Sequence, residues 1–276
     1  MDKRTWTLIL ALVLALSLTA CGGSSGAQTA AQDVELIVFA AASMQETFTE
    51  IGENYQNEHP NVTLTFNFDS SGTLKTQIQE GADCDIFVSA GQKQMDQLDA
   101  AAGAGVNTEG LDFVLTETRF DLLENKVALA VPEGNPANLQ SYDGLKERLE
   151  AQQGILLAIG NPDVPVGQYT QKIFAYWGLD ESALTGCLTY GSNVKEVTTQ
   201  VSEGTVDCGI VYGTDAFSAG LTVVDTATAE MCGQVIYPAA VLNISRHPDE
   251  AQAFLDYVRS PAGAAVLEAV DFTPLG

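Results

Sequence analysis

The stretch from Leu36 to Phe48 constrains the fold most, because it combines a buried strand with the start of a helix. Its first half is apolar throughout, which is typical of a strand covered on both faces. Beyond it, apolar residues recur at i, i+4, i+7 and i+11 along one helix face: Met44, Phe48, Ile51 and Tyr55. Ser43 lies at the change, three residues before Glu46, and this spacing predicts a capping box with Ser43 as the cap. A strand that runs into a helix N-terminus leaves backbone N–H groups unpaired there, which creates an anion site.

The same order of strand, turn and helix recurs along the chain. We predict strands at 36–42, 62–68, 85–89, 127–131, 155–159, 187–190, 206–212 and 235–242, the last interrupted at Pro238. Helical patterns follow most of them, and two more helices, 248–259 and 261–269, close the chain. The unit occurs in the first hundred residues and again between 125 and 225. The pattern therefore predicts an α/β fold with two lobes, each a mostly parallel sheet flanked by helices, and a ligand cleft between them.

The first 20 residues are typical of an export signal. Lys3 and Arg4 precede an apolar run from Thr7 to Leu18, which is short for a membrane-spanning helix. The run ends in Leu-Thr-Ala-Cys, which resembles the lipobox of bacterial lipoproteins, in which Cys21 would carry the lipid. The alternative is an ordinary cleaved signal with a chance cysteine. Residues 21–33, rich in Gly, Ser, Ala and Gln, are predicted to be a flexible tether. We therefore expect an extracytoplasmic domain attached to the cell membrane through Cys21.

Charge and cysteine content narrow the function further. The formal net charge of −24 argues against nucleic acid or anionic lipid as a partner. Any bound anion must then be held by local dipoles. Beyond Cys21 the chain has four cysteines without a metal-binding spacing: Cys84, Cys187, Cys208 and Cys232. We favour free buried thiols and leave one disulfide open.

Four predicted helix N-termini follow strand ends, at Ser43, Ser71, Val166 and Val194. Each offers backbone N–H groups, and the two serines add hydroxyl donors. Taken singly, each is better explained as an ordinary helix start. Taken together, they indicate an anion site at the carboxyl ends of the strands. Asp85 and Asp215 also lie near strand ends, where we expect them to hold turns or cap helices, because free carboxylates would repel an anion.

Several blocks of the sequence, in this order, resemble the substrate-binding proteins of molybdate ABC importers. The blocks are Phe39-Ala-Ala-Ala-Ser43, Ser70-Ser-Gly-Thr-Leu74, Asp85-Ile-Phe-Val-Ser-Ala90 and Gly209-Ile-Val-Tyr-Gly-Thr-Asp-Ala216. The likeness covers residues 34–275. It implies the type II periplasmic-binding-protein fold, with lobe 1 formed by 34–122 and 236–276 and lobe 2 by 123–235. It also implies capture of a tetrahedral oxyanion without catalysis or a cofactor, as a monomer that serves an ABC permease and its ATPase.

The family's ligand positions fall on Ser43, Ser71, Val166, Val194 and Tyr212. The resemblance implies that the serines donate hydroxyl and N–H groups, the valines N–H groups and Tyr212 its phenol. These contacts go to the oxyanion oxygens and not to a metal cation. The turn before Val166 is one residue shorter than the common family form, which also has a smaller residue at this position. Since the position acts through the backbone, binding should survive. Without the resemblance, Tyr212 is as readily explained as a core residue.

Other functions stay open at this stage. The same fold could take sulfate or tungstate, since sulfate differs from molybdate in size and tungstate hardly at all. A serine hydrolase would need a base beside Ser43 or Ser71, and the two histidines of the sequence, His59 and His247, each precede a proline away from the strand ends. A ligand-sensing lipoprotein without a transporter is a third alternative. We prefer capture of molybdate, and of tungstate by the same site, for import.

Overall fold

The computed structural model describes residues 32–275 except 153 and 185. The predicted signal segment (1–20), Cys21 and residues 22–31 of the predicted tether lie outside the described residues. From Asp33 onward the chain forms one compact unit. No helix in the described part of the chain is long and apolar enough to cross a membrane.

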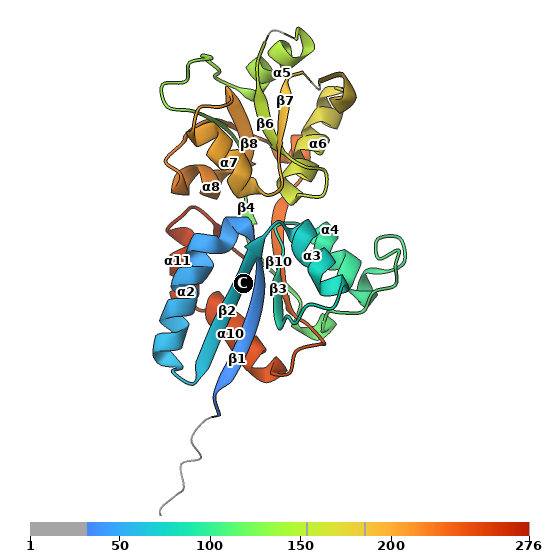
Figure 1. Ribbon diagram of the computed structural model, residues 1–276, viewed down its shortest axis with the longest axis vertical. Helices are drawn as coiled ribbons and strands as arrows, with labels where there is room; N and C mark the ends of the chain where they lie inside the picture. Colours follow the sequence, from blue (N-terminus) through green and yellow to red (C-terminus); the bar gives the residue numbers. More distant parts are fainter. Residues whose placement is uncertain (1–31, 153, 185, 276) are drawn as a thin grey trace, which may run out of the picture. The chain divides into compact units, whose positions relative to one another are not determined.

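The first sheet has the strand order β11-β4-β10-β3-β1-β2 (Figure 1). Its strands are β1 Val34–Ala41, β2 Val62–Asp69, β3 Ile86–Val88, β4 Phe120–Asn125, β10 Val235–Val241 and β11 Thr273–Pro274. Its helices are α2 Gln45–Glu58, α3 Ser71–Gln79, α4 Gln92–Leu98, α10 Pro248–Arg259 and α11 Pro261–Glu268, with 3-10 turns η1 Ala42–Met44, η2 Ala100–Ala102 and η3 Thr116–Thr118. The order β1, α2, β2, α3, β3 confirms the predicted βαβαβ unit.

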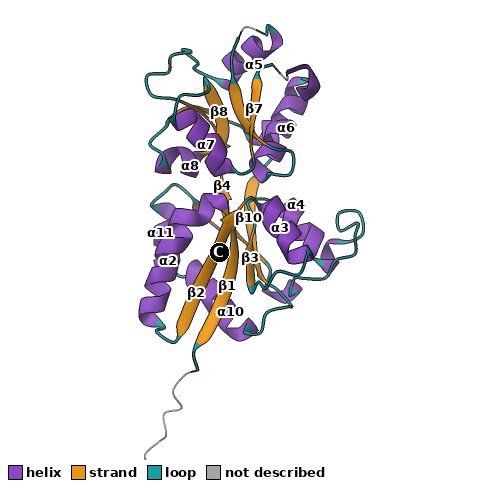
Figure 2. Cartoon of the chain, viewed as in Figure 1, coloured by secondary structure: helices purple, strands orange, loops and turns teal. Residues whose placement is uncertain are grey.

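The second sheet has the strand order β7-β6-β8-β5-β9. Its strands are β5 Val127–Val131, β6 Leu157–Gly160, β7 Leu188–Gly191, β8 Cys208–Tyr212 and β9 Thr222–Thr226. Its helices are α5 Tyr142–Glu150, α6 Pro165–Trp177, α7 Val194–Ser202, α8 Gly213–Ser218 and α9 Ala229–Cys232, with the 3-10 turn η4 Glu181–Leu184. Figure 2 shows that each sheet lies among helices, as the sequence predicted.

Both sheets are mixed, which corrects the prediction of mostly parallel sheets. Strand β1 pairs in parallel with β2 and β3, and β6 pairs in parallel with β7 and β8. Strands β10 and β5 run antiparallel to their neighbours. The reason is connectivity, because these strands bring the chain from one sheet to the other and do not follow a helical crossover within one sheet.

The chain passes between the sheets twice. Strand β4 ends at Asn125 in the first sheet and β5 begins at Val127 in the second, so Lys126 is the first crossing. The return lies between β9 and β10. The pairing register of β10 with β4 shifts between Tyr237 and Pro238. The division into lobe 1 (34–122 and 236–276) and lobe 2 (123–235) remains a prediction. By sheet membership, residues up to Asn125 lie with the first lobe.

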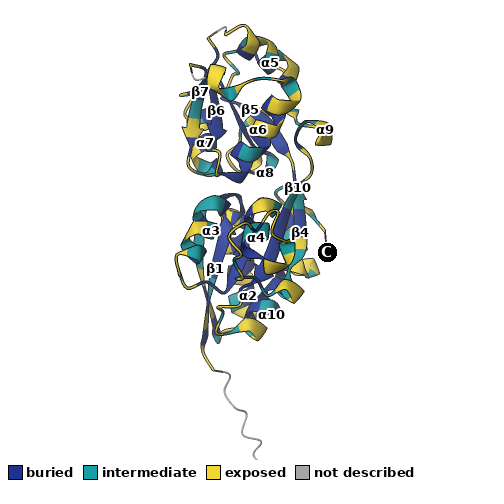
Figure 3. Ribbon diagram, turned by 90° about the vertical axis from the view of Figure 1, so that its right-hand side faces the viewer, coloured by how far each residue is buried: buried dark blue, intermediate teal, exposed yellow. Residues whose placement is uncertain are grey.

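Burial explains why the elements form. The predicted stripe of α2 is buried, with Met44, Phe48 and Ile51 at 0% and Tyr55 at 3% exposure. Figure 3 shows the strands of both sheets mostly buried and the outer faces of the helices exposed. The four described cysteines are buried and free, which confirms the preferred interpretation.

Candidate functional site

The five predicted ligand residues line one cavity. Its lining consists of Ala41, Ala42, Ser43, Ser70, Ser71, Ala90, Val164, Pro165, Val166, Val194 and Tyr212. The five predicted residues are each 5% exposed or less, so a ligand among them would be shielded from solvent. The cavity is about 10 Å³, which is the space of about one water molecule. A tetrahedral oxyanion is larger, so its entry requires the surrounding elements to move apart.

Ser71 is placed by the junction of β2 and α3. Ser70, and not Ser71, is the N-cap of α3, since the Ser70 hydroxyl accepts a hydrogen bond from the Thr73 N–H at 3.1 Å. Ser71 is therefore the first residue of the helix, and its N–H has no acceptor within the helix. The Ser71 hydroxyl accepts a hydrogen bond from the Ala90 N–H at 2.9 Å. Its own proton remains available to the cavity.

Ser43 does not cap a helix, so the predicted capping box is wrong. The chain enters α2 through the 3-10 turn η1, and neither η1 nor α2 has a side-chain cap. Ser43 lies inside that turn, where its hydroxyl is 3.0 Å from the Tyr237 hydroxyl. The residue reaches the cavity as predicted, but it is held there by a side chain of β10.

The second lobe contributes two helix N-termini. Val166 is the second residue of α6, which begins at Pro165 without a side-chain cap, so the Val166 N–H has no partner within the helix. Val194 is the first residue of α7, and the Asn193 side chain caps this helix by accepting from the Glu196 N–H at 3.1 Å. Both helices direct partial positive charge toward the cavity.

Tyr212, the last residue of β8, completes the set. Burial raises the pKa of its phenol well above the ordinary value, so the hydroxyl stays protonated and can donate. The hydroxyl oxygen lies 3.4 Å from the Ala90 carbonyl oxygen of the other lobe, a long hydrogen bond that an anion oxygen could replace. The core interpretation and the ligand interpretation are thus compatible, since Tyr212 is buried and also lines the cavity.

Lys195 and Lys75, which follow Val194 and Ser71 in the sequence, pair with carboxylates and do not line the cavity. Lys195 of α7 donates to both carboxylate oxygens of Glu46 on α2, at 2.8 and 2.7 Å, and so joins the two lobes. Lys75 lies 3.6 Å from Glu109. Asn193 adds another contact between the lobes, donating to Asp69 at 3.3 Å. The cavity itself is therefore lined by neutral donors.

The two aspartates near strand ends have different roles. The Asp85 carboxylate accepts hydrogen bonds from the Ile37 N–H and the Ser245 hydroxyl, which confirms that it holds a turn. Asp215 does not cap a helix as predicted. Its carboxylate is fully buried and lies 3.3 Å from the Lys195 ammonium. Burial raises the pKa of Asp215 to about 6, and Lys195 offsets only part of this shift.

Asp215→Asn is expected to change how stability depends on pH. An unfolded aspartate titrates at about 3.9, so between about pH 4 and pH 6 the folded protein holds a proton that the unfolded chain releases. The wild type should therefore lose up to about 3 kcal/mol from this group as the pH rises through that window, and the variant should not. Denaturant titrations of both proteins at about pH 4 and about pH 8 measure the difference. The exposed Asp112 provides the control Asp112→Asn. If the difference in unfolding free energy between the wild type and Asp215→Asn is the same at both pH values, Asp215 does not have a raised pKa.

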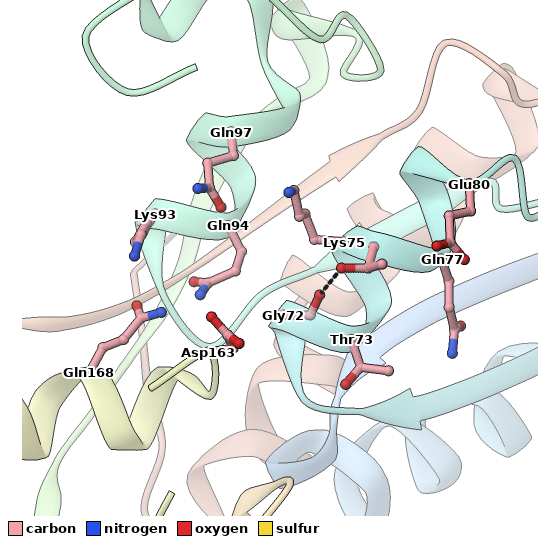
Figure 4. Close-up of a pocket in the computed structure, with 11 residues that line it drawn as sticks. Gly72, Thr73, Lys75, Gln77, Glu80, Lys93, Gln94, Gln97, Asp163 and Gln168 are labelled. Carbon is pink, nitrogen blue, oxygen red and sulfur yellow. Dashed lines mark hydrogen bonds between the residues drawn. The ribbon is translucent and has the colours of Figure 1, made fainter. Parts of the chain in front are cut away.

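A larger groove of about 500 Å³ lies beside the cavity (Figure 4). Its lining includes Lys75, Lys93 and Gln94, but also the carboxylates of Glu80 and Asp163. None of the five predicted ligand residues contributes to it. Volume alone would favour this groove as the ligand site. The cavity is the better candidate for an anion, because its lining side chains carry no carboxylate.

Asn125 and Tyr237 are polar residues behind the cavity that the sequence did not indicate. The Asn125 amide donates to the Tyr237 hydroxyl at 3.2 Å and to the Thr214 hydroxyl at 3.0 Å. Asn125 and Tyr237 are 4% and 0% exposed. Their only sequence signal is a polar group in a run predicted to be strand or crossing, which is too common to identify a site.

Comparisons with known proteins agree with this geometry. The sequence profile of bacterial extracellular solute-binding proteins matches residues 36–272. A Bacillus subtilis protein named "Putative ABC transporter substrate-binding lipoprotein YvgL" is 30% identical over 275 residues, covering 99% of each chain. The molybdate-binding protein ModA of Mycobacterium tuberculosis H37Rv is 31% identical over 271 residues, covering 96% of each chain. The structure of the Azotobacter vinelandii periplasmic molybdate-binding protein aligns with 87% of this chain and 100% of its own, with a TM-score of 0.72 and 20% identity. This likeness confirms the predicted two-lobe periplasmic-binding-protein fold.

Proposed function

Since this chain belongs to the bacterial extracellular solute-binding proteins, we propose that it captures molybdate outside the cell membrane and delivers it to an ABC import permease and its ATPase. The observation that carries the proposal is the convergence of neutral donors from both lobes on one buried cavity. The proposed ligand residues are Ser43, Ser71, Val166, Val194 and Tyr212. Relatives named as molybdate-binding proteins support the choice of anion.

The donor set suits a fully deprotonated dianion. Molybdate offers only acceptor oxygens, and each proposed contact would supply an N–H or O–H donor. Neutral donors at helix ends stabilise a dianion without the desolvation cost of burying full counter-charges. Sulfate has the same charge and shape, so only the spacing of the donors can separate it from molybdate. Tungstate is nearly the same size as molybdate and should bind as well.

Capture and release require the lobes to move relative to each other. The cavity is smaller than the ligand and is lined by residues of both lobes, so we propose that the lobes separate to admit the anion and close around it. We propose a hinge at the two crossings, Lys126 and the segment between β9 and β10. We also propose a monomer attached to the membrane through lipid on Cys21. The sequence of the signal segment and a relative named as a lipoprotein support the attachment.

A serine hydrolase is the alternative from another class, and the side-chain contacts disfavour it. The Ser43 hydroxyl contacts a phenol and the Ser71 hydroxyl accepts from a backbone N–H, so neither is paired with a base. His59 stacks on Tyr55 with ring centroids 4.2 Å apart, at the far end of α2 from Ser43. His247 directly precedes α10. We therefore propose a binding protein without catalytic activity.

Isothermal titration of the purified protein with molybdate, tungstate and sulfate tests the proposal. Molybdate and tungstate should bind with dissociation constants within about tenfold of each other, and sulfate at least about 100-fold more weakly. The physical reason is that donors spaced for the larger anion cannot all reach the smaller one. Sulfate binding as tight as molybdate binding would reassign the ligand. If none of the three anions produces a heat of binding, the oxyanion function is rejected.

A further inference from the structure

A chain of buried hydrogen bonds runs from the crossing between the sheets to the cavity. It begins at Asn125, passes through the Tyr237 hydroxyl and ends at the Ser43 hydroxyl, with links of 3.2 and 3.0 Å. The three residues are 4%, 0% and 5% exposed. A buried polar group left without a partner is costly, so each proton in this chain must have an acceptor.

The direction of the chain is fixed at its first residue. The Lys126 backbone N–H donates to the Asn125 side chain at 2.8 Å, and a backbone N–H can only donate. The atom that receives it must be the amide oxygen, so the amide nitrogen faces Tyr237 and Thr214. Both amide protons are then donated, one to each hydroxyl.

The same reasoning gives the direction of the hydrogen bond between Tyr237 and Ser43. The Tyr237 oxygen accepts from Asn125 and lies 3.0 Å from the Ser43 hydroxyl, and the Tyr212 phenol is a further neighbour. Burial raises the pKa of Tyr237 well above its ordinary value, so the phenol keeps its proton. With an acceptor anion in the cavity, donating that proton to Ser43 pairs every O–H of the chain, whereas accepting from Ser43 as well would leave the phenol proton only the Tyr212 oxygen as an acceptor. Ser43 therefore accepts from Tyr237, and its own proton is left for the cavity.

Ser71 shows the same arrangement by a simpler route. Its hydroxyl accepts from the Ala90 N–H, which again can only donate, so the Ser71 proton is also left for the cavity. Both serine hydroxyls are thus held as donors by groups behind them. Neither can easily turn a lone pair toward a ligand.

We propose that Asn125 and Tyr237 are positioning residues that hold the Ser43 hydroxyl as a donor and thereby select fully deprotonated tetrahedral dianions over hydrogen-bearing ones such as hydrogen phosphate. The inference rests on the proposed oxyanion function and adds which residues enforce its selectivity. A hydrogen-bearing dianion needs an acceptor for its proton, and Ser43 held in this way does not provide one.

Tyr237→Phe tests the inference through a ratio of affinities. The protein is titrated at about pH 8 with molybdate and, in competition, with inorganic phosphate, which is then mainly the hydrogen phosphate dianion. Without the phenol, Ser43 can rotate and accept, so the preference for molybdate over hydrogen phosphate should fall about tenfold or more. A merely structural defect would weaken both ligands alike and leave the ratio unchanged. That unchanged ratio would overturn the inference.

Asn125→Asp is the second variant, and it should reverse the donor–acceptor direction of the hydrogen bonds from Asn125 to Ser43. The carboxylate can accept from both Lys126 and Tyr237, so the phenol would accept from Ser43 and a Ser43 lone pair would face the cavity. The added charge repels both dianions equally and cancels in the ratio, which should again fall about tenfold or more. An unchanged ratio in this variant would also overturn the inference.

The control is Tyr142→Phe, which removes a buried phenol oxygen on α5 that has no hydrogen-bond partner in the described part of the chain. Its ratio should equal that of the wild type, and a fall as large as that of Tyr237→Phe would show that loss of any buried phenol suffices. The proposed function and this inference fail in different ways. If the wild type binds no molybdate, the function is wrong. If the wild type binds and the ratio never moves, only the positioning role is wrong.

Discussion

Replacing Ser43 and Ser71 together by alanine is expected to weaken molybdate binding by about 3–6 kcal/mol, at about 1.5–3 kcal/mol for each hydrogen bond to a charged group. The dissociation constant should rise about 10²–10⁴-fold. Both serines line the cavity. The Ser71 hydroxyl accepts from the Ala90 N–H, and the Ser43 hydroxyl accepts from Tyr237 in the arrangement inferred above, so each has its own proton free for the anion. Titration calorimetry of the double variant and of each single variant gives the values.

The effect should also show non-additivity. The two serines lie on the same lobe and would contact the same anion, so removal of one lets the anion shift toward the other. Ser141→Ala is the control, because Ser141 caps α5 by accepting from the Gly144 N–H at 3.1 Å, away from the cavity. This control should lose about 1 kcal/mol of stability and no affinity. Wild-type affinity in the double variant would place the oxyanion elsewhere.

The predicted ligand residues meet in the structure because their positions follow from periodicity. A strand that ends where a helix begins puts the first helical residues at one edge of the sheet, and this rule needs only local sequence. It brought Ser71, Val166 and Val194 to the cavity. The same rule gave the wrong reason for Ser43, since a 3-10 turn between strand and helix moves the serine off the cap position. Three-residue turns leave no periodic signal.

Strands β4 and β9 were not predicted from the sequence, because they too lack a clear periodic signal. Residues of β9 are exposed or half-buried at the edge of their sheet, so they lack the apolar alternation that marks a strand. In β4, apolar and charged residues alternate irregularly beside the crossing. These strands and the antiparallel β5 and β10 make the sheets mixed, which a count of strand–helix units does not foresee.

The positioning residues could not have been predicted from local sequence. Tyr237 lies 194 positions from Ser43 in the chain, and Asn125 lies 112 positions from Tyr237. Their contacts depend on how two antiparallel strands from distant segments pair, with a register shift at Tyr237 itself. Sequence patterns specify which residues share a face, whereas hydrogen-bond partners between distant strands follow from register and sheet order.

Gly72→Ala is expected to prevent full closure of the lobes. Gly72 is the second residue of α3 in lobe 1, and an added Cβ would lie 2.3 Å from the backbone oxygen of Asp163 in lobe 2. Figure 4 shows the two residues facing each other. Contact distances require about 3 Å or more between such atoms, so the turn at Asp163 must move away. Val166 follows this turn by three residues and would move with it.

The loss should be large because, in the proposed hinge motion, several donors reach the anion only in the closed form. Val166, Val194 and Tyr212 all lie with the second sheet, in α6, α7 and β8, and losing even one hydrogen bond to a dianion costs about 1.5–3 kcal/mol. Molybdate affinity should therefore fall at least about tenfold, and about 10³-fold if two donors are lost. The free energy of unfolding should rise, since alanine in place of a helical glycine favours the helix by up to about 1 kcal/mol.

A matched substitution separates closure from helix propensity. Gly144 also lies in the first turn of a helix, but its added Cβ would meet side chains at 3.6 and 3.7 Å, which is ordinary contact. Gly144→Ala should gain similar stability and keep the wild-type affinity. Small-angle scattering in saturating molybdate should show a larger radius of gyration for Gly72→Ala than for Gly144→Ala or the wild type. Wild-type affinity in Gly72→Ala would mean that the Asp163 turn can shift alone, so that this close approach does not limit the closed, ligand-bound form.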